Sequence, residues 1–460
     1  MSIELIKRAN NIAESGPNVI FCIRNEKFRL DYFLNYYRKI GFTKFWAVDN
    51  LSTDETAQFL ALQSDVTLFS TSASYKGSNA GRDWTSYVAD QYCEDEWCLT
   101  VDVDEYFVFP FVEAVGGISD LIEYLDQNKY QGVFALFLDY YSQKPLSEVE
   151  YQEGENPFDV CSFVDRASSY MTHYSPRFPY FEVKGGPRRR HFWSREGVIA
   201  GPSMRKVPLV RWERGFEYTV ATHSCSPIRL ADITSAIAHF KLLGHFPKFA
   251  VEEVQRNERV SNSVDWRRYA KAMDEEDQCF FNIDVSLEVS SSLDLLKYEH
   301  IASSPQFNHF VLECLNQKRN KVVSDFATKA LKFIGHGVKL DERSKVLDYS
   351  GISRSWLTLS QHCSFVTEPN IDSENLRRIE LSIDAAKDSR LWRASYHFRK
   401  LASRFGLTDQ RSITEEVYSN QSLHSKFTFI YDSIWWDLLG PFRVVEKILI
   451  RLGFIKSRRQ

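Results

Sequence analysis

Hydrophobic and polar residues follow one another along the first 150 residues in a pattern that predicts strands separated by helices. Short, mostly apolar runs, typical of parallel strands buried on both faces, occupy residues 19–23, 44–48, 66–69 and 97–101. Apolar residues at helical spacing occupy the stretches between them, at residues 26–40, 55–60 and 81–93. Gly41 is placed to end the first helix, and Ser52 or Thr53 to cap the second. This order predicts an α/β fold with a parallel, doubly wound sheet and right-handed crossovers.

Two acidic segments lie where such a sheet binds ligands, beyond the carboxyl ends of its strands. The first, residues 49–54, follows the second strand, and the second begins at Asp102 after the fourth. Because successive side chains of a strand point to opposite faces, Asp102 and Asp104 share a face and can converge on one ion. Carboxylates suit Mg²⁺ or Mn²⁺ bound jointly with substrate phosphates. An isolated Asp-x-Asp is usually a solvated loop, so its place after an apolar strand is what makes it a candidate metal site.

Three segments in this order resemble the family 2 glycosyltransferases of the GT-A fold, and in particular the bacterial branch that assembles surface polysaccharides. They are residues 23–26 with the apolar spacing that continues to Phe42, residues 49–56, and residues 102–106. The resemblance covers about 250 of the 460 residues. It implies a GT-A domain, Rossmann-like with a mostly parallel sheet, that binds a nucleotide-diphospho-sugar donor with Mn²⁺ or Mg²⁺ on Asp102 and Asp104.

The resemblance also implies where the donor lies, with its base and ribose over the ends of the first two strands. Asn25 and Glu26 match the stretch after the first strand, and Asp49 matches the carboxylate that contacts the nucleotide. The expected donor-binding set is Arg24, Asn25, Glu26, Asp49, Asn50, Ser52, Asp54, Arg82, Asp102, Arg188, Arg190 and Lys206. A divalent cation there would stabilise the negative charge that develops on the departing nucleoside diphosphate.

A cluster of three arginines, residues 188–190, follows Gly185 and Gly186. Taken alone, such a run indicates a solvated face. The flanking glycines and aromatic residues favour an anionic ligand instead, most simply the diphosphate. Proteins of the resembled family carry a similar GGxRxR stretch followed by Lys-Val-Pro, so Arg188, Arg190 and Lys206 are the phosphate candidates.

Two histidines are candidates for a third metal ligand, which GT-A enzymes often supply late in the domain. His223 follows an apparent strand at residues 218–221, and His239 opens or lies within an expected helix. A single histidine is more often a satisfied core or surface residue. The two histidines are equal candidates on the family pattern.

A catalytic base requires a carboxylate within hydrogen-bond reach of the acceptor hydroxyl. Asp139 follows an apolar strand at residues 133–138, and Glu182 precedes the glycine pair. Either residue can instead be structural. The paired carboxylates of familiar inverting members are not obvious here, so the sequence leaves the stereochemical course open.

Composition bears on the class of ligand and on the expected cellular location of the protein. With 57 Lys+Arg against 61 Asp+Glu the formal net charge is −4, which argues against a nucleic-acid-binding protein. The eight cysteines form no CxxC pair, and residues 1–14 lack the apolar core of a secretory signal, so a cytoplasmic location is expected.

The chain is expected to divide into a GT-A domain at residues 15–250, a mostly helical accessory region at 251–425, and an amphipathic basic segment at 426–460. The last segment carries tryptophans and a basic tip, which fit either peripheral contact with an anionic membrane or a helix docked on the body. The resemblance implies a glycan or lipid-linked acceptor.

Two other functions compete with a glycosyltransferase. A phosphoryl-transfer hydrolase also uses Asp-x-Asp, but usually after the first strand and followed by Thr or Val, whereas Glu105 and Tyr106 follow here. A non-catalytic glycan-binding or scaffold protein with a degenerate GT-A site is the second alternative, and it would bind nucleotide-sugars without turnover.

Overall fold

The structure, a computed structural model, describes residues 3–10, 16–174, 181–196, 200–220, 222–225, 228–259, 263–318 and 325–335. All of these belong to one compact unit of the chain. The expected accessory region beyond residue 335 and the basic segment 426–460 lie outside the described residues. No helix in the described part of the chain is long and apolar enough to cross a membrane.

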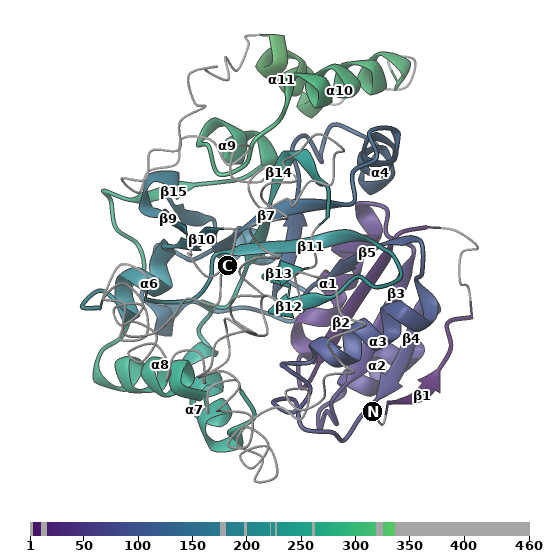
Figure 1. The fold of residues 1–460 in the computed structure, drawn as a ribbon. Helices are drawn as coiled ribbons and strands as arrows, with labels where there is room; N and C mark the ends of the chain where they lie inside the picture. The colour runs from purple at the N-terminus through teal and green to yellow at the C-terminus, as the bar shows by residue number, and fades with distance from the viewer. Residues whose placement is uncertain are drawn as a thin grey trace, which may run out of the picture. The chain divides into compact units, whose positions relative to one another are not determined.

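A mixed sheet forms the centre of this unit (Figure 1). Its strands are β1 (Glu4–Lys7), β2 (Asn18–Ile23), β3 (Lys44–Asp49), β4 (Val66–Ser70), β5 (Glu96–Thr100), β6 (Glu105–Val108), β7 (Gly132–Asp139), β11 (Arg205–Trp212) and β14 (Leu230–His239). Their order is β1-β4-β3-β2-β5-β11-β7-β14-β6. Three two-stranded sheets pair β8 (Phe163–Asp165) with β15 (Ser286–Glu288), β9 (Met171–Tyr174) with β10 (Phe181–Lys184), and β12 (Tyr218–Val220) with β13 (Ser224–Cys225).

The predicted parallel arrangement is confirmed for β2 to β5, which pair in parallel in the order β4-β3-β2-β5. The rest of the sheet is mixed, because β11 runs antiparallel to both β5 and β7, and β6 runs antiparallel to β14. Since β7 and β14 are parallel to each other, the carboxyl ends of β2, β3, β5, β7 and β14 all lie at one edge of the sheet. This edge carries the candidate site.

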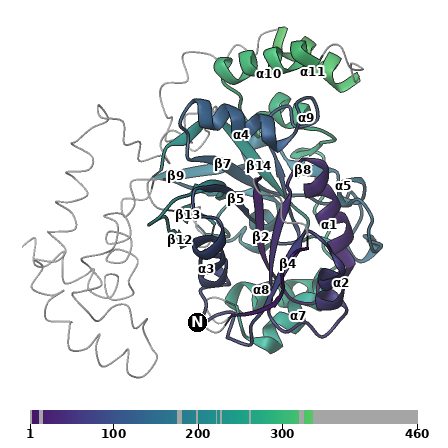
Figure 2. The same ribbon diagram turned by 90° about the vertical axis from the view of Figure 1, so that its right-hand side faces the viewer.

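Helices cover both faces of the sheet (Figure 2). They are α1 (Lys27–Lys39), α2 (Thr56–Leu62), α3 (Arg82–Tyr92), α4 (Ile118–Gln127), α5 (Pro157–Val160), α6 (Gly186–Phe192), α7 (Phe246–Arg256), α8 (Val264–Glu275), α9 (Ser292–Lys297), α10 (Pro305–Lys318) and α11 (Asp325–Gly335). The first two lie together on one face, and α3, which crosses back over β2, lies on the other. Right-handed crossovers require this, because the chain moves outward from β2 to β4 and then returns to β5.

Helix α1 fastens the acidic segment after β5 to the core. Its residues Phe33 and Tyr37 are fully buried and pack edge to face. The Tyr37 hydroxyl donates to the carbonyl of Glu105 at 2.9 Å and accepts the amide of Phe107 at 3.1 Å. The start of β6 is therefore held rigidly where Asp104 leaves the sheet edge.

A second, smaller hydrophobic cluster joins α6, α7 and α8 through residues that include Phe192, Phe246, Trp266 and Tyr269. The expected domain boundary at residue 250 falls inside α7, and the elements that follow belong to the same compact unit as the sheet. The unit thus extends beyond the predicted limit because α7 and α8 bury their aromatic residues against α6.

Three histidines, His300 buried and His223 and His245 half-buried, make the fold sensitive to acid. Burial lowers the pKa of His223 to about 3, with Lys206 adding to the effect, that of His245 to about 3, and that of His300 to about 4. Below their unfolded pKa, about 6.5, the unfolded chain binds protons that the folded chain does not, so stability falls as pH falls. At pH 5.5 the loss amounts to roughly 1 kcal/mol per histidine.

We expect His300→Gln to flatten this acid dependence, since glutamine keeps an N–H to donate to the carbonyl of Asp165, which His300 Nε2 contacts at 2.8 Å. The measurement is the midpoint of urea unfolding at pH 7.5, 6.5 and 5.5. The variant is less stable at pH 7.5 but loses less between pH 7.5 and 5.5 than the unmodified chain. Parallel losses in the two proteins would contradict the assignment.

Candidate functional site

Three adjacent strands bring acidic and imidazole side chains side by side at the sheet edge. His239, the last residue of β14, is paired with Asp139 at the end of β7 and with Glu105 at the start of β6. The predicted helix around His239 is wrong. Residues 230–239 are an almost fully buried run containing Ile233, Thr234 and Ile237, which suits a central strand better than a helix.

The side chains at this edge form a continuous chain of contacts. Asp104 Oδ2 lies 3.2 Å from His239 Nε2, and His239 Nδ1 donates to Asp139 Oδ1 at 2.6 Å. Asp139 Oδ2 in turn accepts from Arg188 Nε at 2.7 Å. Asp139 is fully buried, whereas Asp104 retains 18% side-chain exposure and lines a pocket. This row of side-chain contacts therefore runs from the protein interior to the pocket.

This geometry fits a divalent cation. Within the described residues, ligand atoms of Asp104, Glu105 and His239 lie within 4.8 Å of one another. Because His239 Nδ1 donates to Asp139, a neutral imidazole turns the lone pair of Nε2 toward a carboxylate oxygen of Asp104, a repulsive contact unless a cation or a proton lies between them. Oxygen ligands with one imidazole are the donor set of Mn²⁺ or Mg²⁺ sites.

The carboxylates of the group differ in their electrostatics. Burial raises the pKa of Asp104, but His239, Arg29 and Lys241 outweigh it and hold that pKa well below its usual value, so Asp104 is ionised. Burial raises the pKa of Glu105 against the effect of Lys206. Glu105 accepts from the ammonium of Lys206 and from the amide of Asp102 at 3.2 Å, so it also holds the loop that carries the two aspartates.

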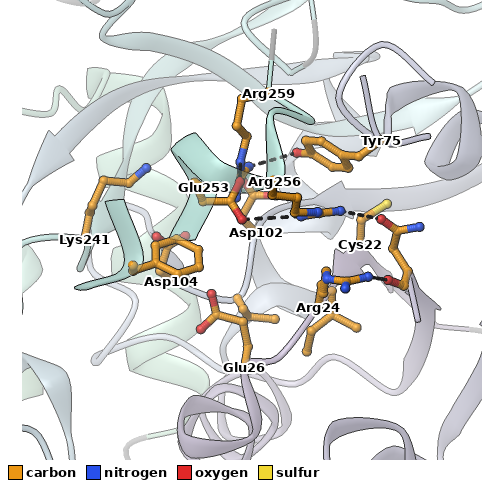
Figure 3. A pocket seen from close by; sticks show the side chains of 14 residues that line it. Cys22, Arg24, Glu26, Tyr75, Asp102, Asp104, Lys241, Glu253, Arg256 and Arg259 are labelled. Atoms are coloured by element: carbon orange, nitrogen blue, oxygen red, sulfur yellow. Dashed lines mark hydrogen bonds and ion pairs between the residues drawn. The ribbon is translucent and has the colours of Figure 1, made fainter. Parts of the chain in front are cut away.

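Asp102 and Asp104 line the same pocket, as their alternation along the chain predicts (Figure 3). Asp102 is exposed and Asp104 is half-buried, while Val101 before them and Val103 between them are buried. The close three-residue group contains Asp104 and His239 from the predicted metal ligands, but neither Asp102 nor His223.

Four cationic and four acidic side chains line this pocket, together with Cys22, Ile23, Asn50, Tyr75, Val103 and Phe249. The cations are Arg24, Lys241, Arg256 and Arg259, and the acids are Glu26, Asp102, Asp104 and Glu253. Burial raises the pKa of Glu26 to about 7 despite the nearby Arg29, so Glu26 is partly protonated at neutral pH. Burial lowers the pKa of Lys241 to about 8, with Asp104 opposing it, so Lys241 remains mostly charged. The formal positive and negative charges of the pocket therefore nearly balance.

Arg256, the last residue of α7, and Arg259, three residues beyond it, are held in place by the pocket wall. Arg256 Nη2 donates to Asn50 Oδ1 at 2.7 Å, and the backbone carbonyl of Asn50 accepts from Arg24 at 2.5 Å. Arg259 pairs with Glu253 and lies over the Tyr75 ring, 5.0 Å from its centroid. Neither of these arginines nor Lys241 was predicted, although Lys241 follows His239 by only two residues.

The predicted nucleotide-binding loops after β2 and β3 form one hydrogen-bonded unit. The Asn25 side chain accepts from the Thr53 amide at 2.7 Å, and Ser52 donates from its hydroxyl and its amide to Asp49. Ser52 and Thr53 thus do not cap α2. Instead Asp54 Oδ1 accepts the Thr56 amide at 3.0 Å. These residues shape the loop, while Arg24, Glu26 and Asn50 reach the pocket itself.

Arg188 and Arg190, which were predicted to bind phosphate, are paired in this structure with buried acidic residues that the sequence pattern did not reveal. Arg188 pairs with Asp139, and Arg190 makes two bonds to Asp165, at 2.9 and 3.2 Å. Neither arginine lines either of the pockets described here.

A neighbouring pocket lies on the other side of Asp102. It shares Cys22, Tyr75 and Asp102 with the first pocket and adds Ala80, Gly81, Arg82, Thr85, Thr100, Val101, Lys206, Tyr218, Thr222 and His223. His223 Nδ1 donates to the carbonyl of Arg205 at 2.7 Å, which leaves its other ring nitrogen as an acceptor. Arg82, Lys206 and His223 are thereby brought together, as candidates for ligand binding rather than metal binding.

The two predicted base candidates lie away from both pocket linings. Asp139 has its oxygens occupied by Arg188 and His239, which together lower its pKa despite the opposing effect of burial. Glu182 pairs with Arg205 at 3.2 Å and with Lys184 at 3.6 Å. The geometry gives Asp139 a supporting contact with His239 in place of a direct contact with an acceptor.

Comparison with protein-family models and with curated proteins gave no match. Among solved structures the chain is similar to a protein from Bacillus anthracis provisionally assigned as a glucose-1-phosphate thymidylyltransferase, solved in complex with a sucrose. The identity is 7%, the TM-score is 0.23, and the alignment covers 64% of this chain and 99% of that one. A likeness at this level carries no argument, so the conclusions below rest on the sheet edge and its two pockets.

Proposed function

We propose that the protein is a metal-dependent glycosyltransferase of the GT-A type. It would move a sugar from a nucleotide-diphospho-sugar to a hydroxyl of a glycan or lipid-linked acceptor, in polysaccharide biosynthesis. The observation that carries the proposal is one pocket lined by Asp102 and Asp104, the second of which contacts His239, and by Arg256 and Arg259 at and just beyond the end of α7.

The metal would be held by Asp104 and His239, with Asp102 and Glu105 beside them, and Mn²⁺ or Mg²⁺ fits these donors. When bound, the cation would supply charge stabilisation to the leaving diphosphate. Tyr37 and Lys206 hold the aspartate loop through Glu105, so the ligands are positioned before any substrate binds.

The diphosphate is the ligand that best matches the charges of the first pocket. The charged side chains of this pocket nearly balance, so a bound divalent cation would make the pocket positive and able to neutralise two phosphates. Arg256 and Arg259 supply guanidinium donors, which bind phosphate oxygens well, and Lys241 supplies an ammonium. The nucleoside would contact Ile23, Arg24 and Asn50 at the ends of β2 and β3.

The neighbouring pocket would receive the sugar. Threonine and tyrosine hydroxyls, with Arg82 and His223, offer donors and acceptors to a polyhydroxylated ring. Its shared wall with the first pocket, at Asp102, would place the sugar next to the diphosphate. The cytoplasmic location and peripheral membrane contact expected from the sequence fit a lipid-linked acceptor and form part of the same proposal.

Thermal melting against a panel of nucleotide-sugars, with and without Mn²⁺, tests the function. We expect one or a few donors to raise the melting temperature by several degrees with Mn²⁺ and by much less without it, because the diphosphate binds jointly with the metal. In the absence of an acceptor, the protein should also hydrolyse these donors slowly, transferring the sugar to water and releasing the nucleoside diphosphate. Stabilisation by a donor with no release and no transfer to any acceptor would favour the non-catalytic binding protein instead.

A further inference from the structure

The arginine of α6 that the sequence assigns to phosphate reaches the candidate metal site by another route. Arg188 is 5% exposed and its partner Asp139 is fully buried. A buried ion pair costs much desolvation free energy and is weak evidence for a stabilising role by itself. The buried Arg188–Asp139 pair therefore calls for a role beyond stability. The contact made by the second carboxylate oxygen of Asp139 indicates that role.

That oxygen accepts the Nδ1 proton of His239 at 2.6 Å, on the strand pair in which the two residues are register partners. The bond fixes the tautomer of the ring and points Nε2 toward Asp104. Phe137 packs against the ring of His239, with centroids 4.4 Å apart, and prevents it from turning away. A histidine in this setting is held for ligation through Nε2.

We infer that Arg188 and Asp139 are positioning residues for the metal ligand His239, forming an Arg188–Asp139–His239 chain that ends at Asp104. The inference rests on the metal-binding part of the proposed function. Arg188 orients the Asp139 carboxylate, and the carboxylate orients the imidazole for ligation through Nε2.

Helix α6 carries a built-in comparison for this chain. Arg190, two residues further along the same helix, pairs with the buried Asp165 where Arg188 pairs with Asp139. If the arginines only secure α6, loss of either should have the same consequences. If the chain positions the metal ligand, only Arg188 and Asp139 should affect metal binding.

The test measures Mn²⁺ binding to the full-length protein by electron paramagnetic resonance of the free ion, without any nucleotide-sugar. Asp139→Asn presents an amide with a single acceptor to two donors, Arg188 and His239, so one of the two bonds is lost. We expect its Mn²⁺ dissociation constant to rise by about 10- to 100-fold, as for other partners of metal-ligating histidines. Arg188→Gln should show a similar rise, and Arg188→Lys a smaller one because it keeps the charge.

The control is Arg190→Gln, which should lower the melting temperature while leaving Mn²⁺ affinity within about twofold. Because Asp139→Asn leaves a buried guanidinium unpaired and can prevent folding, the double variant Asp139→Leu with Arg188→Met removes both charges together with the acceptor of His239 Nδ1, and it keeps the packing volume. A double variant that folds and keeps its Mn²⁺ affinity would overturn the inference. An equal loss of Mn²⁺ affinity in Arg190→Gln would also overturn it, as would the absence of Mn²⁺ binding by the unmodified protein.

These outcomes are separable from those of the proposed function. If the protein turns over no nucleotide-sugar but its Asp139 variants bind Mn²⁺ more weakly, the positioning role of Arg188 and Asp139 is supported and the glycosyltransferase function is contradicted. If the protein turns over a donor but the same variants bind Mn²⁺ with unchanged affinity, the function is supported and the positioning role is contradicted.

Discussion

Asp104→Asn should abolish metal-dependent release of nucleoside diphosphate from whichever donor the melting panel identifies, with kcat lowered on the order of 10³-fold or more. Asp104 is ionised, lines the pocket and lies 3.2 Å from His239 Nε2, so the substitution removes a negative ligand from the centre of the site. A bound cation provides several kcal/mol of charge stabilisation, and each 1.4 kcal/mol or so corresponds to a factor of ten in rate.

The measurement is steady-state turnover over a range of Mn²⁺ concentrations, compared with Asp284→Asn. Asp284 is exposed on the loop between α8 and β15, so its neutralisation removes the same charge without touching the sheet edge. The double variant Asp102→Ala with Asp104→Ala should be equally inactive. Turnover that survives in this double variant with metal chelated would rule out the proposed role of the acidic pair.

The strand-end aspartates could be predicted because the signal is local. An apolar run, a parallel crossover and an Asp-x-Asp spacing lie within a few residues of one another, and each constrains where the next side chain points. The same reasoning identified β2 to β5. It did not identify the mixed half of the sheet, because the pairing of β11 between β5 and β7 is set by contacts remote in sequence.

The arginines predicted to bind phosphate and those that the sequence did not single out show the same limit of a sequence pattern. A run of three arginines after a glycine pair reads the same whether it faces phosphate or buried acids, and Asp139 and Asp165 lie 49 and 25 residues from their arginine partners. Conversely, Arg256 and Arg259 sit in a charged helical segment that looks solvated. Only the packing of α7 against α8 turns that end toward the pocket. His239 was found by its family context, although its strand was predicted as a helix.

Arg256 and Arg259 line the pocket, whereas Arg188 and Arg190 do not. We therefore expect Arg256→Gln and Arg259→Gln each to lower kcat/KM for the donor by about 10²-fold. Both side chains line the pocket beside Asp102 and Asp104, and removing one preorganised donor from a developing oxyanion typically costs a factor of 10² to 10³. Arg259→Lys should retain part of the activity, since it keeps the charge opposite Glu253 but loses the planar donor pair.

The matched controls are Arg267→Gln, an exposed position on α8, and Arg190→Gln, whose side chain pairs with Asp165 outside the pocket. Initial rates over a range of donor concentrations, together with donor-induced shifts in melting temperature, separate lost binding from lost turnover. If Arg190→Gln reduces donor affinity as much as Arg256→Gln does, the phosphate contacts belong to α6, as the sequence pattern alone had indicated. If only Arg256→Gln and Arg259→Gln do, the diphosphate is bound by the end of α7 and the residues that follow it, beyond the predicted end of the domain at residue 250.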